Sequence, residues 1–195
     1  MSETTDRRHL RRALRAERRG LTPATRRAAS RRACARLRRL PWFRQARDIA
    51  LYLPLPDEAD PRFLADRDRV HRFFVPAMVG HDRMRFARLD PRLPLRRNRF
   101  GIPEPQHPGR RLRRPATLDL VVMPLVGFDD HCNRLGQGGG HYDRAFSFLV
   151  HRRLRHGGPR LVGLAFECQR VTGLPHRHWD VPLDAVVTEA DIHMR

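Results

Sequence analysis

Lysine is absent from this sequence, although it carries 40 basic side chains, all arginine, and a net charge of +19 over 195 residues. Such a charge favours polyanionic partners, including nucleotides and nucleic acid. No helix-turn-helix, zinc-finger or RNA-binding signature accompanies it, and aromatic side chains, on which bases stack, make up only 7% of the chain. We therefore expect no specific nucleic-acid partner. The lack of lysine also excludes a Walker loop, which ends in Gly-Lys-Ser/Thr.

Cysteine is scarce as well. Cys34, Cys132 and Cys168 lie far apart and form no Cys-x-x-Cys pair, so we expect reduced thiols rather than a disulfide framework or a zinc site. No apolar run approaches the roughly 18 residues of a membrane span. The N-terminus lacks the apolar stretch of a secretion signal, and its acidic residues argue against a transit peptide. These absences predict a cytoplasmic protein with no membrane partner.

The length suits a single domain, which we place at residues 1–195. The first forty residues are predicted to be helical. Thr22-Pro23 is typical of an N-cap followed by proline in the first turn of a second helix, which should end at Pro41. The apolar face of that helix would contain four residues: Ala29, Ala33, Leu37 and Leu40.

Short apolar runs replace the helical pattern after residue 41. Such runs, several of them followed by proline, indicate strands buried on both faces of a sheet. The predicted strands span residues 49–53, 72–75 (ended by Pro76), 118–123, 161–166 and 184–187, with a more exposed strand at 84–89. A helix is predicted at 142–154 and an irregular connection at 90–115. This alternation predicts an α/β domain with helices on both sides of the sheet.

The segment from Arg134 to Asp143 carries four glycines in five positions, between a predicted strand and a predicted helix. Glycines let the backbone approach a ligand with several N–H groups pointing inward. Arg134 adds a fixed cation, and Asp143 could hold magnesium, so the segment suits a metal-bound polyphosphate. It is not a dinucleotide fingerprint, which would need glycine at His141. A tight turn in which only glycine fits remains the alternative.

The residues Arg134-Leu135-Gly136-Gln137-Gly138-Gly139-Gly140-His141-Tyr142-Asp143, preceded by Pro124-x-x-x-Phe128-Asp129, resemble the signature of the 5-formyltetrahydrofolate cyclo-ligase family. The resemblance covers nearly the whole chain. Arg11 and Arg15 occupy the place of a Lys-x-x-x-Arg pair on the family's first helix, and Glu58 matches an acid that binds the folate. Further similar stretches are 100–105, 166–169 and 179–184.

The resemblance implies a three-layer α/β/α sandwich similar to the ribose-phosphate isomerase and CoA-transferase group. It implies that 5-formyltetrahydrofolate, possibly polyglutamylated, and ATP are converted to 5,10-methenyltetrahydrofolate, ADP and phosphate, with Mg²⁺ as cofactor. Phosphorylation of the formyl oxygen would require charge neutralisation rather than a Cys, Ser or His nucleophile. Arg134 would be the catalytic residue, Leu53 and Glu58 would bind the folate, and Asp143 and Asp184 would bind the metal. The implied ATP-binding residues are Arg11, Arg15, Arg134, Leu135, Gly136, Gln137, Gly138, Gly139, Gly140, His141 and Tyr142.

Three residues depart from the family pattern: Arg11 replaces lysine, Cys132 replaces a glycine, and His141 replaces an aromatic residue. Cys132 would alter the turn before Arg134 if that turn needs a positive φ. Without the resemblance, the arginines of the first helix could form a solvated basic face, and the three acids Glu58, Asp143 and Asp184 could be ordinary surface or element-start residues. A sugar-phosphate or CoA-handling enzyme of the same fold is a further alternative. Monomer and homodimer are equally compatible with the sequence.

Overall fold

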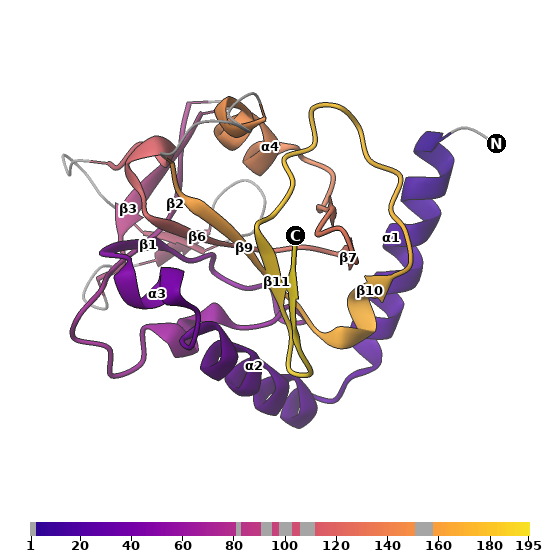
Figure 1. Cartoon of the computed structure of the whole chain (residues 1–195), viewed down its shortest axis with the longest axis horizontal. Helices are drawn as coiled ribbons and strands as arrows, with labels where there is room; N and C mark the ends of the chain where they lie inside the picture. The colour runs from indigo at the N-terminus through magenta and orange to yellow at the C-terminus, as the bar shows by residue number, and fades with distance from the viewer. Residues whose placement is uncertain (1–2, 81–82, 91–94, 98–102, 106–111, 151–157) are drawn as a thin grey trace.

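The computed structural model describes residues 3–80, 83–90, 95–97, 103–105, 112–150 and 158–195. At its centre is a seven-stranded sheet in the order β12-β11-β9-β6-β1-β2-β3 (Figure 1). Neighbouring strands from β11 to β2 are parallel, and β12 and β3 pair antiparallel at the two edges. The strands are β1 (Asp48–Ala50), β2 (Arg72–Val79), β3 (Arg83–Arg88), β6 (Leu120–Met123), β9 (Arg160–Leu164), β11 (Ala185–Val187) and β12 (Ile192–Met194). The predicted α/β fold is confirmed, and its central sheet is mostly parallel.

Helices lie on both faces of this sheet, with α2 (Pro23–Leu37) and α4 (His141–Phe146) on opposite sides (Figure 1). Ala33 and Leu37 of α2 pack with Ile49 in one buried cluster. Phe146 of α4 packs with Phe86 in the cluster on the other face. The remaining helical elements are α1 (Glu3–Gly20), α3 (Pro41–Gln45), η1 (Pro61–Leu64), η2 (Pro115–Thr117), η3 (Ser147–Leu149) and η4 (Glu167–Gln169).

Two small sheets complete the described fold. One contains β7 (Gly127–Asp129), β8 (Arg134–Leu135) and β10 (Arg170–Val171), and the other pairs β4 (Leu95–Arg97) with β5 (Pro103–Pro105). The first small sheet lies beside α1 (Figure 1), where Leu14 packs with Leu135. No helix within the described ranges is long and apolar enough to cross a membrane.

The second helix begins as predicted, because Thr22 Oγ1 accepts a hydrogen bond from the Thr25 N–H (3.1 Å) and Pro23 follows in the first turn. Its predicted end at Pro41 is wrong. α2 ends at Leu37, and Pro41 instead opens the short helix α3. Proline suits a first turn because the N–H it lacks would have no helical partner there.

Pro76 does not end the second strand, as the sequence had suggested, but lies inside β2 opposite Phe86. Phe86 exchanges both of its backbone hydrogen bonds with Arg113, on the side away from β2. The pair of Pro76 and Phe86 is therefore a non-hydrogen-bonded pair of the antiparallel ladder. A proline costs no ladder hydrogen bond at such a position.

Two further predictions are corrected. The helix predicted at 142–154 is shorter, because α4 ends at Phe146 and a 3₁₀ turn follows to Leu149; residues 151–157 lie outside the described residues. The connection at 90–115 is not wholly irregular, since β4 and β5 pair antiparallel within it. Much of that connection, including 98–102, lies outside the described residues.

The order of the strands predicts where a ligand crevice lies. The chain runs from β1 to β2 on one side, whereas β6 pairs with the other side of β1. At such a switch point the connections leave the sheet in opposite directions, which opens a crevice at the carboxyl ends of the two strands. This topology predicts a ligand site beyond Ala50 and Met123, where β1 and β6 end.

Candidate active site

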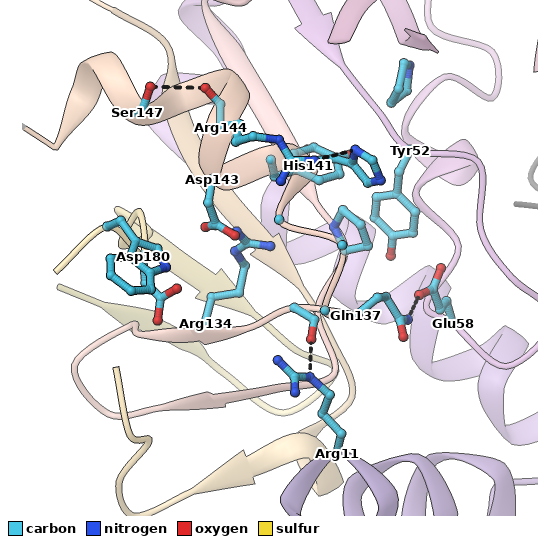
Figure 2. A pocket seen from close by; sticks show the side chains of 18 of the residues that line it. Arg11, Tyr52, Glu58, Arg134, Gln137, His141, Asp143, Arg144, Ser147 and Asp180 are labelled. Atoms are coloured by element: carbon cyan, nitrogen blue, oxygen red, sulfur yellow. Dashed lines mark hydrogen bonds and ion pairs between the residues drawn. The ribbon is translucent and has the colours of Figure 1, made fainter. Parts of the chain in front are cut away.

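A cavity of about 700 Å³ lies at this switch point. Tyr52 and Leu53, which follow β1, line it together with Pro124, which follows β6. Its other walls include the glycine loop (residues 136–140), the first turn of α4, the α1 residues Arg7 and Arg11, and three residues near the C-terminus: Arg177, Trp179 and Asp180. Figure 2 shows Arg134 and Asp143 between Asp180 on one side and Glu58 on the other.

The glycine loop is a tight turn and a cavity wall at once. Gly138 has φ +110° and Gly140 has φ +63°, which side-chain-bearing residues rarely adopt. Gly136 and Gly139 have no such φ, yet they line the cavity, and a Cβ at Gly139 would lie 2.9 Å from the His141 ring. The turn interpretation thus accounts for two of the glycines, and close packing along the cavity accounts for the others.

Arg134 is a buried cation in the wall of the cavity. Its Nη2 donates to Asp143 Oδ1 at 2.5 Å, and its guanidinium lies 5.8 Å from the centre of the Tyr142 ring. Its buried Nε has no hydrogen-bond partner among the described residues. Because a buried donor is costly to leave unpaired, this atom is suited to an acceptor supplied by a ligand or a water molecule.

Arg11 and Arg15 extend from α1 to the glycine loop. Arg11 Nε donates to the Gly136 carbonyl at 2.9 Å, and Arg15 Nη2 donates to the side-chain oxygen of Gln137 at 2.6 Å. Burial and the neighbouring Arg7 and Arg15 lower the pKa of Arg11. Arg11 lines the cavity, whereas Arg15 supports the loop from outside the cavity lining. The two arginines are therefore loop contacts rather than members of a solvated basic face.

Glu58 is buried and hydrogen-bonded rather than an ordinary surface carboxylate. Gln137 Nε2 donates to its Oε1 at 2.7 Å, and the Leu55 N–H donates to its Oε2 at 3.0 Å. Burial raises the pKa of Glu58 above its usual range, and the hydrogen bonds and Arg18 offset only part of this effect. Glu58 and Leu53 both line the cavity, as expected for residues that contact one ligand.

Asp184, the second predicted metal ligand, does not line the cavity and is not brought together with Asp143 there. It directly precedes β11 and so lies at the amino ends of the parallel strands, whereas the cavity lies at their carboxyl ends. Its two carboxylate oxygens already accept hydrogen bonds, from Arg160 Nη1 and from the Leu161 N–H, both at 2.8 Å. Within the described ranges, no group of three or more His, Cys, Asp or Glu could hold a metal ion.

Asp180, four positions before Asp184, lines the cavity instead. Arg7 holds it there, since Arg7 Nη1 donates to Asp180 Oδ2 at 2.7 Å and to the Pro175 carbonyl at 2.8 Å. Our sequence interpretation missed both residues. The spacing of four between Arg7, Arg11 and Arg15 was an available signal, because it places them on one helix face. Further lining residues that we had not singled out are Tyr52, Leu55, Pro76, Met78, Arg144, Ser147, Arg177 and Trp179.

The two other departures lie close to the site. Cys132 adopts φ +57°, so the turn before Arg134 does require the left-handed conformation that glycine favours. The buried Sγ of Cys132 donates to the His193 carbonyl at 3.4 Å, and burial raises the pKa of this thiol to about 11. His141 begins α4 and lines the cavity; its Nδ1 lies 3.1 Å from Arg144 Nη2.

Comparison with known proteins identifies the family of this chain. The sequence model of the 5-formyltetrahydrofolate cyclo-ligase family matches residues 3–189. The 5-formyltetrahydrofolate cyclo-ligase of Escherichia coli (strain K12) is 32% identical over 183 residues, which cover 92% of this chain and 98% of that protein. The enzyme of the same name from Haemophilus influenzae is 38% identical over 144 residues, 72% of this chain and 74% of that protein.

Solved structures are similar over nearly the whole chain. The NMR structure of Aquifex aeolicus 5,10-methenyltetrahydrofolate synthetase has a TM-score of 0.80 at 29% identity, covering 96% of this chain and 92% of that one. The 5,10-methenyltetrahydrofolate synthetase from Mycoplasma pneumoniae has a TM-score of 0.69 at 23% identity, covering 94% and 99%, which supports the fold. The match of the family model, the extent of the curated relatives and the shared fold confirm the resemblance first seen between Arg134 and Asp143. This chain belongs to the 5-formyltetrahydrofolate cyclo-ligase family.

Proposed function

We propose that the cavity at the end of β1 and β6 converts 5-formyltetrahydrofolate to 5,10-methenyltetrahydrofolate by ATP-driven phosphorylation of the formyl oxygen. The conversion itself is the activity of the family to which the chain belongs. The observation that carries the phosphorylation step is the buried Arg134, which lines the same cavity as the glycine loop and Glu58 and whose Nε has no hydrogen-bond partner among the described residues.

The chemistry explains this need for positive charge. A formamide carbon is a poor electrophile, and its oxygen is a poor leaving group. Transfer of the γ-phosphoryl group of ATP to the formyl oxygen forms an O–P bond and breaks the bond between the β- and γ-phosphates, so ADP is released. The second folate nitrogen then attacks the formyl carbon, the C–O bond breaks, and the proton of that nitrogen leaves with the phosphate. Such transfers depend on positioning and charge neutralisation.

The polar half of the cavity, which contains Arg134, the glycine loop and Asp143, would supply both the positioning and the charge neutralisation. Arg134 and the backbone N–H groups of the glycine loop would bind the transferred phosphoryl group, and Arg11 would orient the loop through Gly136. The nucleoside end of ATP would lie toward Trp179, a half-exposed aromatic residue on the wall that includes Asp180. Figure 2 shows Arg134 between this wall and Glu58, as expected if the phosphates join the two ends of the cavity.

The acids of this half suit magnesium carried by ATP. Mg²⁺ is commonly held by one or two carboxylates together with substrate phosphates. Asp143 Oδ1 accepts from Arg134 and from the Val181 N–H, and Asp180 Oδ2 accepts from Arg7. Among the described residues, Asp143 Oδ2 and Asp180 Oδ1 accept no hydrogen bond, so these two oxygens would hold the ion. Bound magnesium would neutralise charge on the β- and γ-phosphates.

The other half suits a reduced folate. Its apolar surface is formed by Tyr52, Leu53, Leu55, Pro76, Met78 and Tyr142. Glu58 is the buried acceptor in this half and would bind N–H groups of the folate ring. Burial raises the pKa of Cys34 to about 12 and that of Cys132 to about 11, and none of the three cysteines lines the cavity. The mechanism therefore uses no thiol nucleophile.

Two wider proposals follow from the sequence and the family. The sheet belongs to the ribose-phosphate isomerase and CoA-transferase group of α/β/α folds, and the enzyme works in the cytosol. Its partners are 5-formyltetrahydrofolate and ATP, with Mg²⁺ as the metal. These proposals are supported by family membership.

The direct test is the appearance of methenyl absorbance in the near ultraviolet when purified protein is mixed with 5-formyltetrahydrofolate, magnesium and ATP. We expect absorbance that requires ATP and is lost in folded Arg134→Ala and Asp143→Ala variants. Arg32→Ala, on the exposed side of α2, is the matched control and should retain full activity. Product formation without ATP would contradict the phosphorylation step. No product from folded, ATP-binding protein would redirect the search to other phosphoryl acceptors.

A further inference from the structure

We propose that Gln137 is a positioning residue that couples the two halves of the cavity, so that ATP and the folate each raise the affinity of the enzyme for the other. The inference rests on the proposed function of those halves. It concerns a direct contact between the glycine loop and the folate-side acid Glu58, which are 79 positions apart in the chain.

The contact is specific in both directions. Gln137 Nε2 donates to Glu58 Oε1 at 2.7 Å, while Gln137 Oε1 accepts from Arg15 Nη2 at 2.6 Å (Figure 2 shows the first of these bonds). An ionised carboxylate can only accept and a guanidinium can only donate, and the Gln137 amide, which has both a donor and an acceptor, satisfies both partners in this orientation. The orientation of the Gln137 amide is therefore determined by its two neighbours.

Gln137 is the residue of the glycine loop (136–140) that carries a side chain. Gly136, Gly138, Gly139 and Gly140 surround it and carry no side chain. Between Leu135 and His141, it is consequently the only residue whose side chain can connect the phosphate-binding backbone to the folate half.

Both ends of the bridge are anchored on one helix. Arg15 of α1 holds Gln137, and Arg18, one turn later and fully buried, holds the segment that carries Glu58. Arg18 Nη2 donates to Asp57 Oδ2 at 2.8 Å, and Arg18 Nη1 lies 3.7 Å from Glu58 Oε1. The helix thus provides a rigid support against which the loop and the acid are positioned together.

This arrangement leads to cooperative binding. Phosphates bound to the loop would order its backbone and so the Gln137 amide, which would hold Glu58 in place for the folate. A folate bound to Glu58 would order the same contact from the other side. The ligand that binds first orders the contact, so the second ligand loses less conformational entropy when it binds. By thermodynamic linkage, ATP raises the affinity for the folate by the same factor as the folate raises the affinity for ATP.

The bridge also affects the charge of Glu58. The charged and titratable groups around this carboxylate are Arg18 and Asp57, with the buried hydroxyls of Tyr52 and Tyr142. Burial raises the pKa of Glu58, and the hydrogen bond from Gln137 lowers it. Loss of the Gln137 amide should therefore raise this pKa further, and Glu58 would ionise only at higher pH.

The test measures two affinities by calorimetry: that for 5-formyltetrahydrofolate with and without the non-hydrolysable analogue AMP-PNP and magnesium, and that for AMP-PNP with and without the folate. In the wild type we expect each ligand to strengthen the other by the same factor, about 5-fold or more. In Gln137→Met, which keeps the size of the side chain and removes both hydrogen bonds, the factor should fall to about 1. The control is Gln45→Met, an exposed glutamine at the end of α3, which should retain the wild-type factor.

A second readout separates coupling from mere loop stability. In Gln137→Met, the pH midpoint for binding of 5-formyltetrahydrofolate should move to higher pH. If Gln137→Met fails to fold, Arg15→Met, which removes only the outer anchor, should lower the coupling factor. Independent binding in the wild type, or an unchanged factor in these variants, would overturn the inference and leave the proposed function intact. Failure of either ligand to bind the wild type would instead overturn the proposed function, and this inference with it.

Discussion

Arg7 Nη1 lies 2.7 Å from Asp180 Oδ2, so the first helix holds a segment 173 positions further along the chain. Both side chains are largely buried, at 8% and 15% exposure. The contact joins two walls of the cavity and keeps Asp180 beside the proposed phosphate site.

Arg7→Met should remove the contact that holds Asp180 in the cavity wall. Because the change leaves Asp180 without its buried cation, we expect the free energy of unfolding to fall by about 1–3 kcal/mol. The KM for ATP should rise about tenfold, with a smaller change in kcat, since the lost contact positions the nucleotide rather than the reacting groups. Urea unfolding and steady-state kinetics measure both quantities. Arg8→Met, an exposed neighbour on α1, is the control, and an equal effect of both changes would contradict the prediction.

Glu58→Gln should alter the pH dependence of stability. Burial raises the pKa of Glu58 above the ordinary value of 4.5, so the folded state holds this proton more tightly than the unfolded state does. Its contribution to stability is therefore complete below pH 4.5 and is lost as the pH rises through the folded-state pKa. Relative to the wild type, Glu58→Gln should become progressively more stable across that interval and should bind 5-formyltetrahydrofolate more weakly.

Urea unfolding of both proteins at several pH values from about 4 to 7 checks this sign. Glu17→Gln, which changes an exposed acid of α1, serves as the control and should show no such trend. A stability difference between Glu58→Gln and the wild type that does not vary with pH would mean that Glu58 titrates normally.

Cys132 tests the backbone conformation before Arg134. Cys132→Gly and Cys132→Ala both remove the sulfur, but only glycine accepts φ +57° without strain. The relief of about 1–2 kcal/mol exceeds the entropic cost of glycine, about 0.5–1 kcal/mol, so Cys132→Gly should be the more stable variant. At Cys34, inside α2, the order should reverse by about 1 kcal/mol, because glycine is a poor helix former. Chemical denaturation of the four variants measures their free energies of unfolding. If the glycine variant is the more stable one at both positions, or the alanine variant at both, the prediction is wrong.

The thiols themselves should be dispensable for catalysis. Cys132→Ser and Cys168→Ser should retain kcat within a few-fold of the wild type, since phosphoryl transfer to the formyl oxygen uses no protein nucleophile. The measurement is methenyl formation at saturating ATP and folate. An activity loss of 100-fold or more in either folded variant would show that the mechanism involves a thiol and is wrong as proposed.

Trp179 offers a spectroscopic test of where the nucleotide lies. The sequence contains two tryptophans, and Trp42→Phe leaves Trp179 as the only one. Trp179 is 50% exposed and lines the cavity, so magnesium and ATP should change its fluorescence through contact with the nucleoside end. A spectrum unaffected by saturating ATP would place the nucleoside elsewhere. Trp179→Phe, which retains only Trp42 on α3, is the control and should show no response.

Sequence patterns determined the elements whose causes are local. Thr22 and Pro23 begin α2 because capping requires only neighbouring residues. The apolar runs predicted strands buried on both faces of a sheet, because a strand covered on both faces must be apolar along its whole length. The motif from Arg134 to Asp143 predicted a wall of the cavity because its glycines, its cation and its acid lie within ten consecutive positions, and all of these line the cavity.

Only the tertiary structure decided the features that depend on register and on distant partners. Pro76 fits inside β2 because Phe86 directs its hydrogen bonds to Arg113. Asp180 lines the cavity and Asp184 does not, although four positions separate them, because β11 begins just after Asp184 and points its carboxyl end toward the site. The contact between Gln137 and Glu58 likewise has no local signal, since each residue obtains its partner from a segment that the sheet, and not the chain, brings close.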